Sequence, residues 1–209
     1  MPIPLYFASI SEKTNANVMQ LGFGFHDGGA LRLPQKRLSN VPIAIDDAII
    51  PNQLDPQRLN ALCRAADKGV FLDFERPQSA FHDALIKAVH KFAPFVWLPE
   101  KYRCDFQDVI AVCACAEPCN RWEAFAAERQ RRHSNRWALE LIPWNRTVKR
   151  ENAATGKTVY LGTSVCMADF GAQSVRYYDT RQTLLKKLSI AAAYGCCGAV
   201  CLWEEWPRE

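Results

Sequence analysis

The chain has 209 residues, of which 49% are hydrophobic and 23% charged, and it carries a formal net charge of +4. These values are typical of an ordinary folded domain, and the charge is too small to indicate a nucleic-acid partner. No run approaches the roughly 20 apolar residues of a membrane helix, so we expect no membrane partner either. The N-terminal residues MPIPLYFASISEK show no secretory signal, which predicts a cytoplasmic location, or an extracellular one if a signal was removed.

Eight short apolar runs follow one another along the chain, rich in β-branched and aromatic residues. They cover residues 4–9, 18–25, 41–47, 69–75, 94–100, 108–117, 136–143 and 198–205. None shows a clean alternation of apolar and polar residues, which is typical of strands buried on both faces of a parallel sheet. A further strand is expected at 159–165, within the less regular stretch 145–178.

Helical patterns separate several of these runs. The pattern over 55–68 begins with Asp55 as N-cap and Pro56 at the first helical position. The pattern over 179–195 begins with Asp179 as N-cap and ends at Gly195. Two more helices are expected over 79–92 and 120–132, whereas the early connections 10–17 and 35–40 are too short for good helices. The alternation predicts a single domain, residues 1–209, folded as a compact (β/α)8 TIM barrel with shortened early helices.

The nine cysteines and four histidines show no spacing that is typical of a metal site. The odd number of cysteines and their apolar neighbours predict buried free thiols. The histidines are dispersed, and we expect surface positions for His26, His82, His90 and His133. The sequence therefore predicts neither a bound metal nor another cofactor.

Acidic residues gather at the carboxyl ends of six of the apolar runs. They are Asp46, Asp47, Asp73, Glu75, Glu100, Glu117, Glu140, Glu204 and Glu205. In a parallel barrel these ends share one face, where barrel enzymes keep their catalytic residues. Asp73 and Glu75 are two residues apart, so their side chains point the same way along a strand. Two nearby carboxylates raise the pKa of one of them, which provides a general acid near neutral pH.

Aromatic residues accompany these acids. Tyr102 and four tryptophans lie at or just after strand ends, the tryptophans being Trp97, Trp144, Trp203 and Trp206. Sugar rings stack their apolar faces on aromatic side chains while their hydroxyl groups bond to carboxylates. Together the acids and the aromatic residues predict a glycan as substrate or ligand.

Two segments resemble glycoside hydrolase family 18, the chitinase-like barrels: GVFLDFER (69–76) and the block from Tyr177 to Glu205. Against the family's D-G-x-D-x-D-x-E signature, Gly69, Asp73 and Glu75 match, while Lys68 and Phe71 replace the first two acids. The C-terminal block has Tyr-Asp at 178–179, a helix with lysines at 186 and 187, Gly-x-x-Gly at 195–198 and a strand ending in Trp203. The segment 22–33, GFGFHDGGALRL, is similar to the family's second strand and turn.

The resemblance implies hydrolysis of N-acetylglucosamine-containing glycans by a retaining mechanism in which the substrate's own 2-acetamido group takes part. It implies that Glu75 protonates the leaving oxygen, that Asp73 orients the acetamido group, and that Trp203 forms the floor of a sugar subsite. We expect further substrate contacts from other residues of the rim: Asp46, Trp97, Glu100, Glu117, Glu140 and Glu204.

Two alternatives stay open. Phe71 stands where the family has an inner aspartate, and CACAEP (113–118) stands where it has a Tyr-Asp pair, so the chain is alternatively a barrel that binds a glycan or a protein without turnover. The other alternative is an enzyme that holds a divalent cation between Asp46, Asp47, Asp73 and Glu75. The sequence makes no prediction of the oligomeric state.

Overall fold

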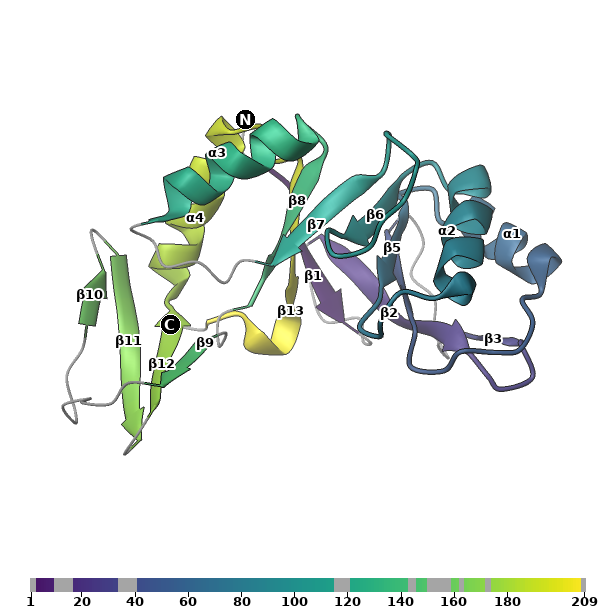
Figure 1. Ribbon diagram of the computed structural model, residues 1–209, viewed down its shortest axis with the longest axis horizontal. Helices are drawn as coiled ribbons and strands as arrows, with labels where there is room; N and C mark the ends of the chain where they lie inside the picture. The colour runs from purple at the N-terminus through teal and green to yellow at the C-terminus, as the bar shows by residue number, and fades with distance from the viewer. Residues whose placement is uncertain are drawn as a thin grey trace. The chain divides into compact units, whose positions relative to one another are not determined.

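The computed structural model describes residues 3–9, 17–33, 41–114, 121–142, 146–149, 159–161, 164–171 and 174–207. The chain divides into two compact units, described separately below: an N-terminal unit of residues 6–113 and a C-terminal unit of residues 1–5 and 114–209. The kinds and order of the elements are those of a compact (β/α)8 barrel, as predicted (Figure 1). The prediction that residues 1–209 form a single domain stays a prediction.

Parallel strands form the sheet of the N-terminal unit. In chain order they are β1 (Leu5–Ser9), β2 (Val18–Phe25), β4 (Ile43–Asp46), β5 (Val70–Asp73), β6 (Val96–Pro99) and β7 (Ile110–Ala114), each paired with the next. The two-residue β3 (Leu31–Arg32) pairs antiparallel with the end of β2. Every parallel strand of this unit lies within one of the apolar runs, so the sequence prediction of these strands is confirmed.

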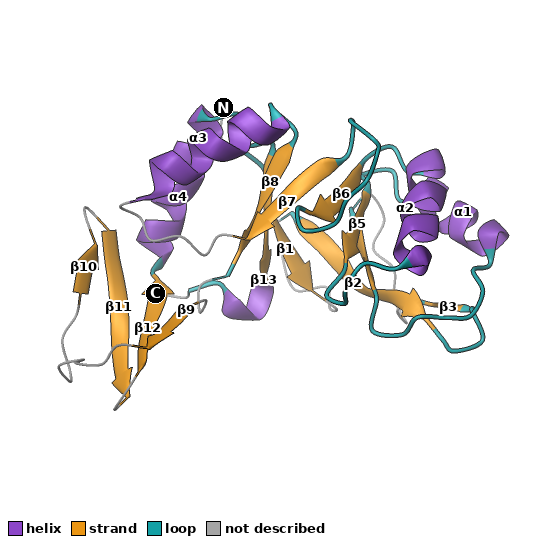
Figure 2. Ribbon diagram, viewed as in Figure 1, coloured by secondary structure: helices purple, strands orange, loops and turns teal. Residues whose placement is uncertain are grey.

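Two helices connect strands of this sheet and cover one of its faces (Figure 2). Helix α1 (Pro56–Ala65) joins β4 to β5, and α2 (Ala80–Phe92) joins β5 to β6. The Asp55 carboxylate accepts hydrogen bonds from the backbone N–H groups of Gln57 and Arg58, at 3.1 and 3.0 Å, which confirms it as the N-cap of α1. The connections before β4 contain no helix within their described residues.

Alternate residues of the strands pack against these helices. The shared core includes Ile43, Ile45, Val70, Leu72, Phe74, Val96 and Leu98 from the sheet and Leu59, Leu62, Leu85, Ile86 and Val89 from the helices. Burying each such side chain contributes about 1.5–3 kcal/mol, and a slip of one residue would turn the whole set toward the other face. The core therefore fixes which residues project from the face opposite the helices: Ala44 and Asp46 on β4, and Phe71 and Asp73 on β5.

In the C-terminal unit, β8 (Trp137–Leu141) pairs in parallel with β13 (Gly198–Leu202), which leads into a 3₁₀ turn, η2 (Trp203–Glu205). Helices α3 (Trp122–His133) and α4 (Arg181–Ala193) pack on each other. Between β8 and α4 the chain forms an antiparallel sheet of β9 (Arg146–Lys149), β10 (Val159–Leu161), β11 (Ser164–Gly171) and β12 (Ser174–Asp179). The sequence predicted only one strand in this stretch.

The prediction that Asp179 caps the last helix is wrong. Asp179 ends β12, and the N-cap of α4 is Thr180, whose side chain accepts a hydrogen bond from the Thr183 N–H. The Asp179 carboxylate is buried and accepts hydrogen bonds from Lys187 Nζ at 2.6 Å and from Thr183 Oγ1 at 2.9 Å. A buried ammonium group needs a partner of opposite charge, and this pairing occupies both oxygens of Asp179. The helix ends as predicted, with Gly195 at a positive φ of 77°.

Among the side chains that the structure describes, six cysteines are free thiols: Cys63, Cys113, Cys196 and Cys201 are buried, as predicted, whereas Cys104 and Cys197 are partly exposed. Burial raises the pKa of the Cys63, Cys196 and Cys201 thiols to about 12. These side chains therefore stay protonated at neutral pH and act as small core residues rather than nucleophiles. Within the described parts of the chain, no helix is long and apolar enough to cross a bilayer.

Candidate functional site

The signature-like segment lies on β5, which follows β1, β2 and β4 as the fourth parallel strand in the described chain. Asp73 is the last residue of β5, and it is the register partner of Asp46 on β4. Both side chains project from the face opposite the helices, so two carboxylates stand side by side where the two strands end. Glu75 follows two residues later and is exposed to solvent.

Asp46 forms an ion pair with Arg32, which the sequence analysis did not single out. The Arg32 guanidinium donates a hydrogen bond to Asp46, whose other oxygen accepts one from the Ala48 N–H at 3.1 Å. Gly24 on β2 leaves the room for this pair, because a Cβ there would lie 2.6 Å from Arg32 Nη2 and 2.8 Å from Asp46 Oδ1. The predicted substrate-binding residue Asp46 is thus held by a cation at the strand ends.

Asp47 points to the other side of the sheet, toward α2, and is only 2% exposed. Its Oδ1 accepts a hydrogen bond from the Glu75 N–H at 3.0 Å. Its Oδ2 accepts from the Arg76 N–H at 2.9 Å and lies 3.1 Å from His82 Nε2. The expectation that Asp47 lies on the rim beside Asp46 is wrong, because neighbouring residues of a strand point to opposite faces. A cation shared by all four acids does not fit this arrangement, since both Asp47 oxygens are occupied.

Hydrogen bonding decides the charge of Asp47. Burial raises the pKa of its carboxyl, but the hydrogen bonds from Glu75, Arg76 and His82 outweigh that effect and hold the pKa below the ordinary value of 3.8. Three donors stabilise the anion more than the lost water destabilises it. Asp47 is therefore a fixed negative charge at neutral pH.

His82 is fully buried, so its predicted surface position is wrong. Its Nδ1 lies 3.1 Å from the backbone nitrogen of Ser79 and 2.8 Å from Ser79 Oγ. The backbone N–H is only a donor, so Nδ1 accepts, and the ring proton sits on Nε2, where it is donated to Asp47. The rings of Phe74, Phe81 and Tyr102 pack around the imidazole, with centroids 4.8, 5.5 and 5.6 Å from it.

Hydrogen bonds also reach the two residues 75 and 76, which we call the held segment, from the loop after β6. Lys101 Nζ donates to the Glu75 carbonyl oxygen at 3.3 Å, and the Tyr102 hydroxyl donates to the Arg76 carbonyl oxygen. The Arg76 guanidinium in turn donates to the Ala48 carbonyl oxygen at 2.5 Å. The backbone N–H and C=O groups of both residues are thus bonded, although the strand has already ended.

Tyr102 lies beneath the held segment, on the helix side of the sheet, where its ring packs near that of His82. Burial, followed by the charges of Asp47, Glu75 and Asp73, raises the pKa of the Tyr102 phenol to about 12. The phenol therefore stays protonated at neutral pH, which lets it donate its hydrogen bond to the Arg76 carbonyl oxygen. The candidate site comprises Asp46 and Asp73 at the strand ends and the exposed Glu75 beyond them, with Asp47, His82 and Tyr102 beneath the held segment.

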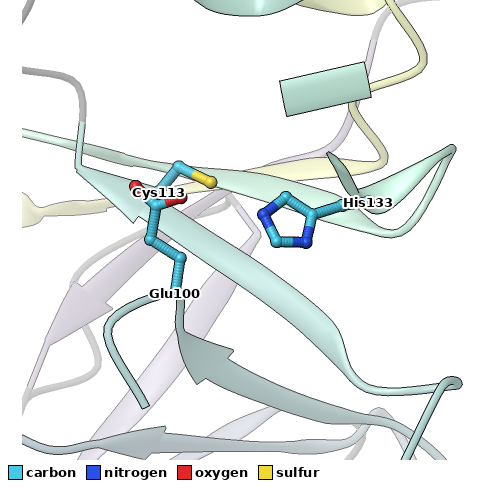
Figure 3. Close-up of side chains that lie close together, drawn as sticks. All are labelled: Glu100, Cys113 and His133. Atoms are coloured by element: carbon cyan, nitrogen blue, oxygen red, sulfur yellow. The ribbon is translucent and has the colours of Figure 1, made fainter. Parts of the chain in front are cut away.

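Other residues of the predicted site lie elsewhere or outside the described residues. Trp97 is 6% exposed and packs edge-to-face on Tyr6, with ring centroids 5.6 Å apart. Glu100 follows β6, and its carboxylate lies within 4.8 Å of the Cys113 thiol on β7 (Figure 3). Glu117 lies outside the described residues. In the C-terminal unit Glu140 lies on β8, while Trp203 and the exposed Glu204 lie in η2. The contacts with substrate that the sequence predicts for all these residues stay predictions.

A cavity of about 280 Å³ opens between α2 and the loop of residues 103–106. Ile86 and Phe106 contribute apolar surface to it, and Lys87 and Arg103 contribute charged groups. Neither Asp73 nor Glu75 lines this cavity. It lies beside α2, on the helix side of the sheet, and is separate from the candidate site.

Comparisons with known proteins give a fold but no family. The sequence matches no protein-family model and no curated protein. The structure is similar to that of the spore cortex-lytic enzyme SleL of Bacillus megaterium QM B1551, with a TM-score of 0.57 and 10% identity over 96% of this chain and 70% of the other. It is also similar to the C-terminal domain of a proposed chitinase from Desulfitobacterium hafniense DCB-2, with a TM-score of 0.58 and 12% identity over 99% of this chain and 95% of that domain.

The chain shares the fold of these two solved structures. Identities this low carry the fold alone, since one barrel fold hosts many activities. The resemblance to family 18 stays a prediction, although its signature segment occupies the fourth parallel strand, where that family carries it.

Proposed function

We propose that this protein is a glycosidase that hydrolyses N-acetylglucosamine-containing glycans, with Glu75 as the general acid and Asp73 as its partner. The observation that carries the proposal is the placement of these two carboxylates at and just beyond the end of the fourth parallel strand. Barrel enzymes keep their catalytic residues at the carboxyl ends of their strands. The glycoside-hydrolase-like fold supports the same assignment by analogy.

The reaction needs only groups that these residues and the substrate provide. The exposed Glu75 carboxyl gives its proton to the glycosidic oxygen as the bond from that oxygen to the anomeric carbon breaks. The carbonyl oxygen of the substrate's 2-acetamido group forms a bond to the same carbon, while the Asp73 carboxylate accepts a hydrogen bond from the acetamido N–H. Water then opens the cyclic intermediate and returns a proton to Glu75, so the anomeric configuration is retained.

The alternative is a barrel that binds a glycan without turnover, and one observation favours it. Phe71, two residues before Asp73 on β5, is 4% exposed and stands beside Trp97 in the register of β5 and β6. An apolar side chain therefore occupies the place where the family signature has an inner acid. The acid that the sheet register places beside Asp73 is Asp46 on β4, not a residue of β5 itself.

Hydrolysis of a chromogenic chito-oligosaccharide separates the two readings. We expect the wild-type chain to release the chromophore and Glu75→Gln to lower the rate by at least about 100-fold, the scale of losing a general acid. Glu123→Gln, on the exposed first turn of α3, is the matched control and should keep the wild-type rate. Saturable binding without release of the chromophore supports the binding barrel, and an unchanged rate in Glu75→Gln removes Glu75 from the mechanism.

A further inference from the structure

We propose that Asp47 and His82 are positioning residues for Glu75, acting through the backbone of the held segment. The proposal rests on the proposed function, because it assigns a role relative to the same acid. Asp47 binds both N–H groups of the held segment, and His82, fully buried on α2, binds Asp47. Neither residue touches substrate in this scheme.

Glu75 needs such support because the sheet does not provide it. Strand β5 ends at Asp73, and Glu75 lies two residues beyond it with an exposed side chain. The Phe74 N–H already turns back to the Leu72 carbonyl oxygen at 3.0 Å, so the ladder is broken at this point. Without Asp47 the backbone of residue 75 would have no partner for its N–H group among the hydrogen bonds of the described structure. A general acid must be held near its reactive geometry, because a displacement of about 1 Å costs about 100-fold in rate.

The composition of the buried pair argues that it does more than fill the core. A carboxylate and an imidazole under three aromatic rings lose their hydration, and apolar residues of similar size usually stabilise a core at least as well. Ser79 and a shorter N3 side chain would suffice to cap α2. The pair has a further effect: it holds an anion whose two oxygens fix the orientation of two successive peptide N–H groups. Both of those groups belong to the residue proposed as the acid and its neighbour.

A positioning role predicts a particular kinetic pattern. Loosening the held segment displaces the Glu75 carboxyl from the glycosidic oxygen, and this interaction gains its strength only as the bond breaks. The loss therefore falls on kcat, whereas KM, which reflects sugar contacts made elsewhere, stays near its wild-type value. A purely structural role would lower the amount of folded enzyme without altering kcat per folded molecule.

The test compares three variants of the full chain with a chromogenic chito-oligosaccharide. In Asp47→Asn the amide offers one acceptor oxygen in place of two, and in His82→Gln the Asp47 carboxylate stays while its buried partner changes. Asp55→Ala is the matched control, since Asp55 also accepts two backbone N–H hydrogen bonds, but on α1. We expect kcat to fall by about 100-fold in Asp47→Asn and by about tenfold in His82→Gln with KM within about twofold, and the control to keep both constants.

Amide hydrogen exchange at Glu75 and Arg76, measured by NMR, provides a readout that does not depend on turnover. Both amides should be protected in the wild type and in Asp55→Ala, and at least one of them should lose protection in Asp47→Asn, which keeps a single acceptor oxygen. If Asp47→Asn does not fold, His82→Gln decides the question by the same two readouts.

The outcomes separate the two proposals. Wild-type hydrolysis that Glu75→Gln abolishes, with kcat unchanged in Asp47→Asn and His82→Gln, overturns the positioning role and leaves the proposed function standing. Absence of wild-type hydrolysis overturns the proposed function, and the positioning role with it, since there is then no acid to position. A fall in kcat at constant KM, together with lost protection of at least one of the two amides, supports both.

Discussion

Each unit of the molecule buries an acid beside a base, but the two pairs use their hydrogen bonds differently. In the C-terminal unit Asp179 accepts from Lys187 and Thr183, both on the helix that follows it. Trp122 on α3 packs against the same lysine: its indole N–H donates to the Lys187 backbone carbonyl oxygen at 2.7 Å, and Lys187 Nζ lies 5.1 Å from the centroid of its ring. In the N-terminal unit Asp47 accepts from His82 and from two N–H groups of the held segment.

The difference teaches how to separate a structural pair from a functional one in the same fold. A pair whose donors all come from elements packed around it contributes stability, and its removal should be felt in unfolding. A pair whose carboxylate accepts hydrogen bonds from an exposed, irregular segment fixes the conformation of that segment. Its removal should lower the rate of a reaction catalysed by residues of that segment.

Breaking the structural pair should have the largest effect on stability. In Lys187→Met the buried Asp179 carboxylate loses its cation, which should cost about 3–5 kcal/mol in the free energy of unfolding, measured by urea denaturation. Lys186→Met, at the exposed neighbouring position, is the control and should change that free energy little. Equal losses of unfolding free energy in the two variants would show that the buried pair contributes no more to stability than an exposed lysine. A lower kcat per folded Lys187→Met molecule would contradict the purely structural role of this pair.

A smaller effect is expected at Gly24, which leaves room for Asp46 on the face opposite Asp47. In Gly24→Ala the new methyl group displaces the ends of the Arg32 and Asp46 side chains, which are about one-third exposed at 35% and 31%. Ion pairs this exposed contribute about 0–1 kcal/mol, so stability should change little while KM for a chito-oligosaccharide rises. Gly28→Ala is the control, because nothing lies within 4 Å of a Cβ there. An unchanged KM in Gly24→Ala would remove Asp46 from substrate binding.

The smallest effect concerns pH. The folded-state pKa of Asp47 lies below 3.8, chiefly because hydrogen bonds from Glu75, Arg76 and His82 overcome the effect of burial. A lowered folded pKa means that Asp47 contributes its stability above its unfolded pKa and loses it as pH falls through the folded value. Urea midpoints at about pH 5 and about pH 3 should therefore differ less in Asp47→Asn than in the wild type. The same difference between the two urea midpoints in both proteins would show that these hydrogen bonds do not lower the pKa of Asp47 in the folded state.

The sequence predicted the parallel strands and the helices well because apolar runs and helix-terminating residues are local signals. It placed the runs of the parallel strands, the cap at Asp55 and the glycine stop at Gly195. It missed most of the antiparallel sheet of residues 146–179 because short, irregular strands depend on pairing with partners far along the chain.

The sequence correctly placed Asp73 at the end of a strand, but it missed the burial of Asp47 and His82. The run 41–47 has no polar alternation to show which of Asp46 and Asp47 faces the helices, and only the packing of Ile43 and Ile45 decides it. The surface position predicted for His82 did not take the period of its helix into account. The buried stripe of α2 is His82, Leu85, Ile86 and Val89, at spacings of three, four and seven, and this pattern was present in the sequence.

The most direct test is a crystal structure of Glu75→Gln with a bound chito-oligosaccharide. The account predicts that the side-chain amide at position 75 lies within about 2.6–3.2 Å of the glycosidic oxygen. It also predicts that the sugar whose anomeric carbon carries this oxygen places its acetamido group against Asp73. A glycan bound with its scissile bond away from position 75, or a glycan whose acetamido group makes no contact with Asp73, would contradict it.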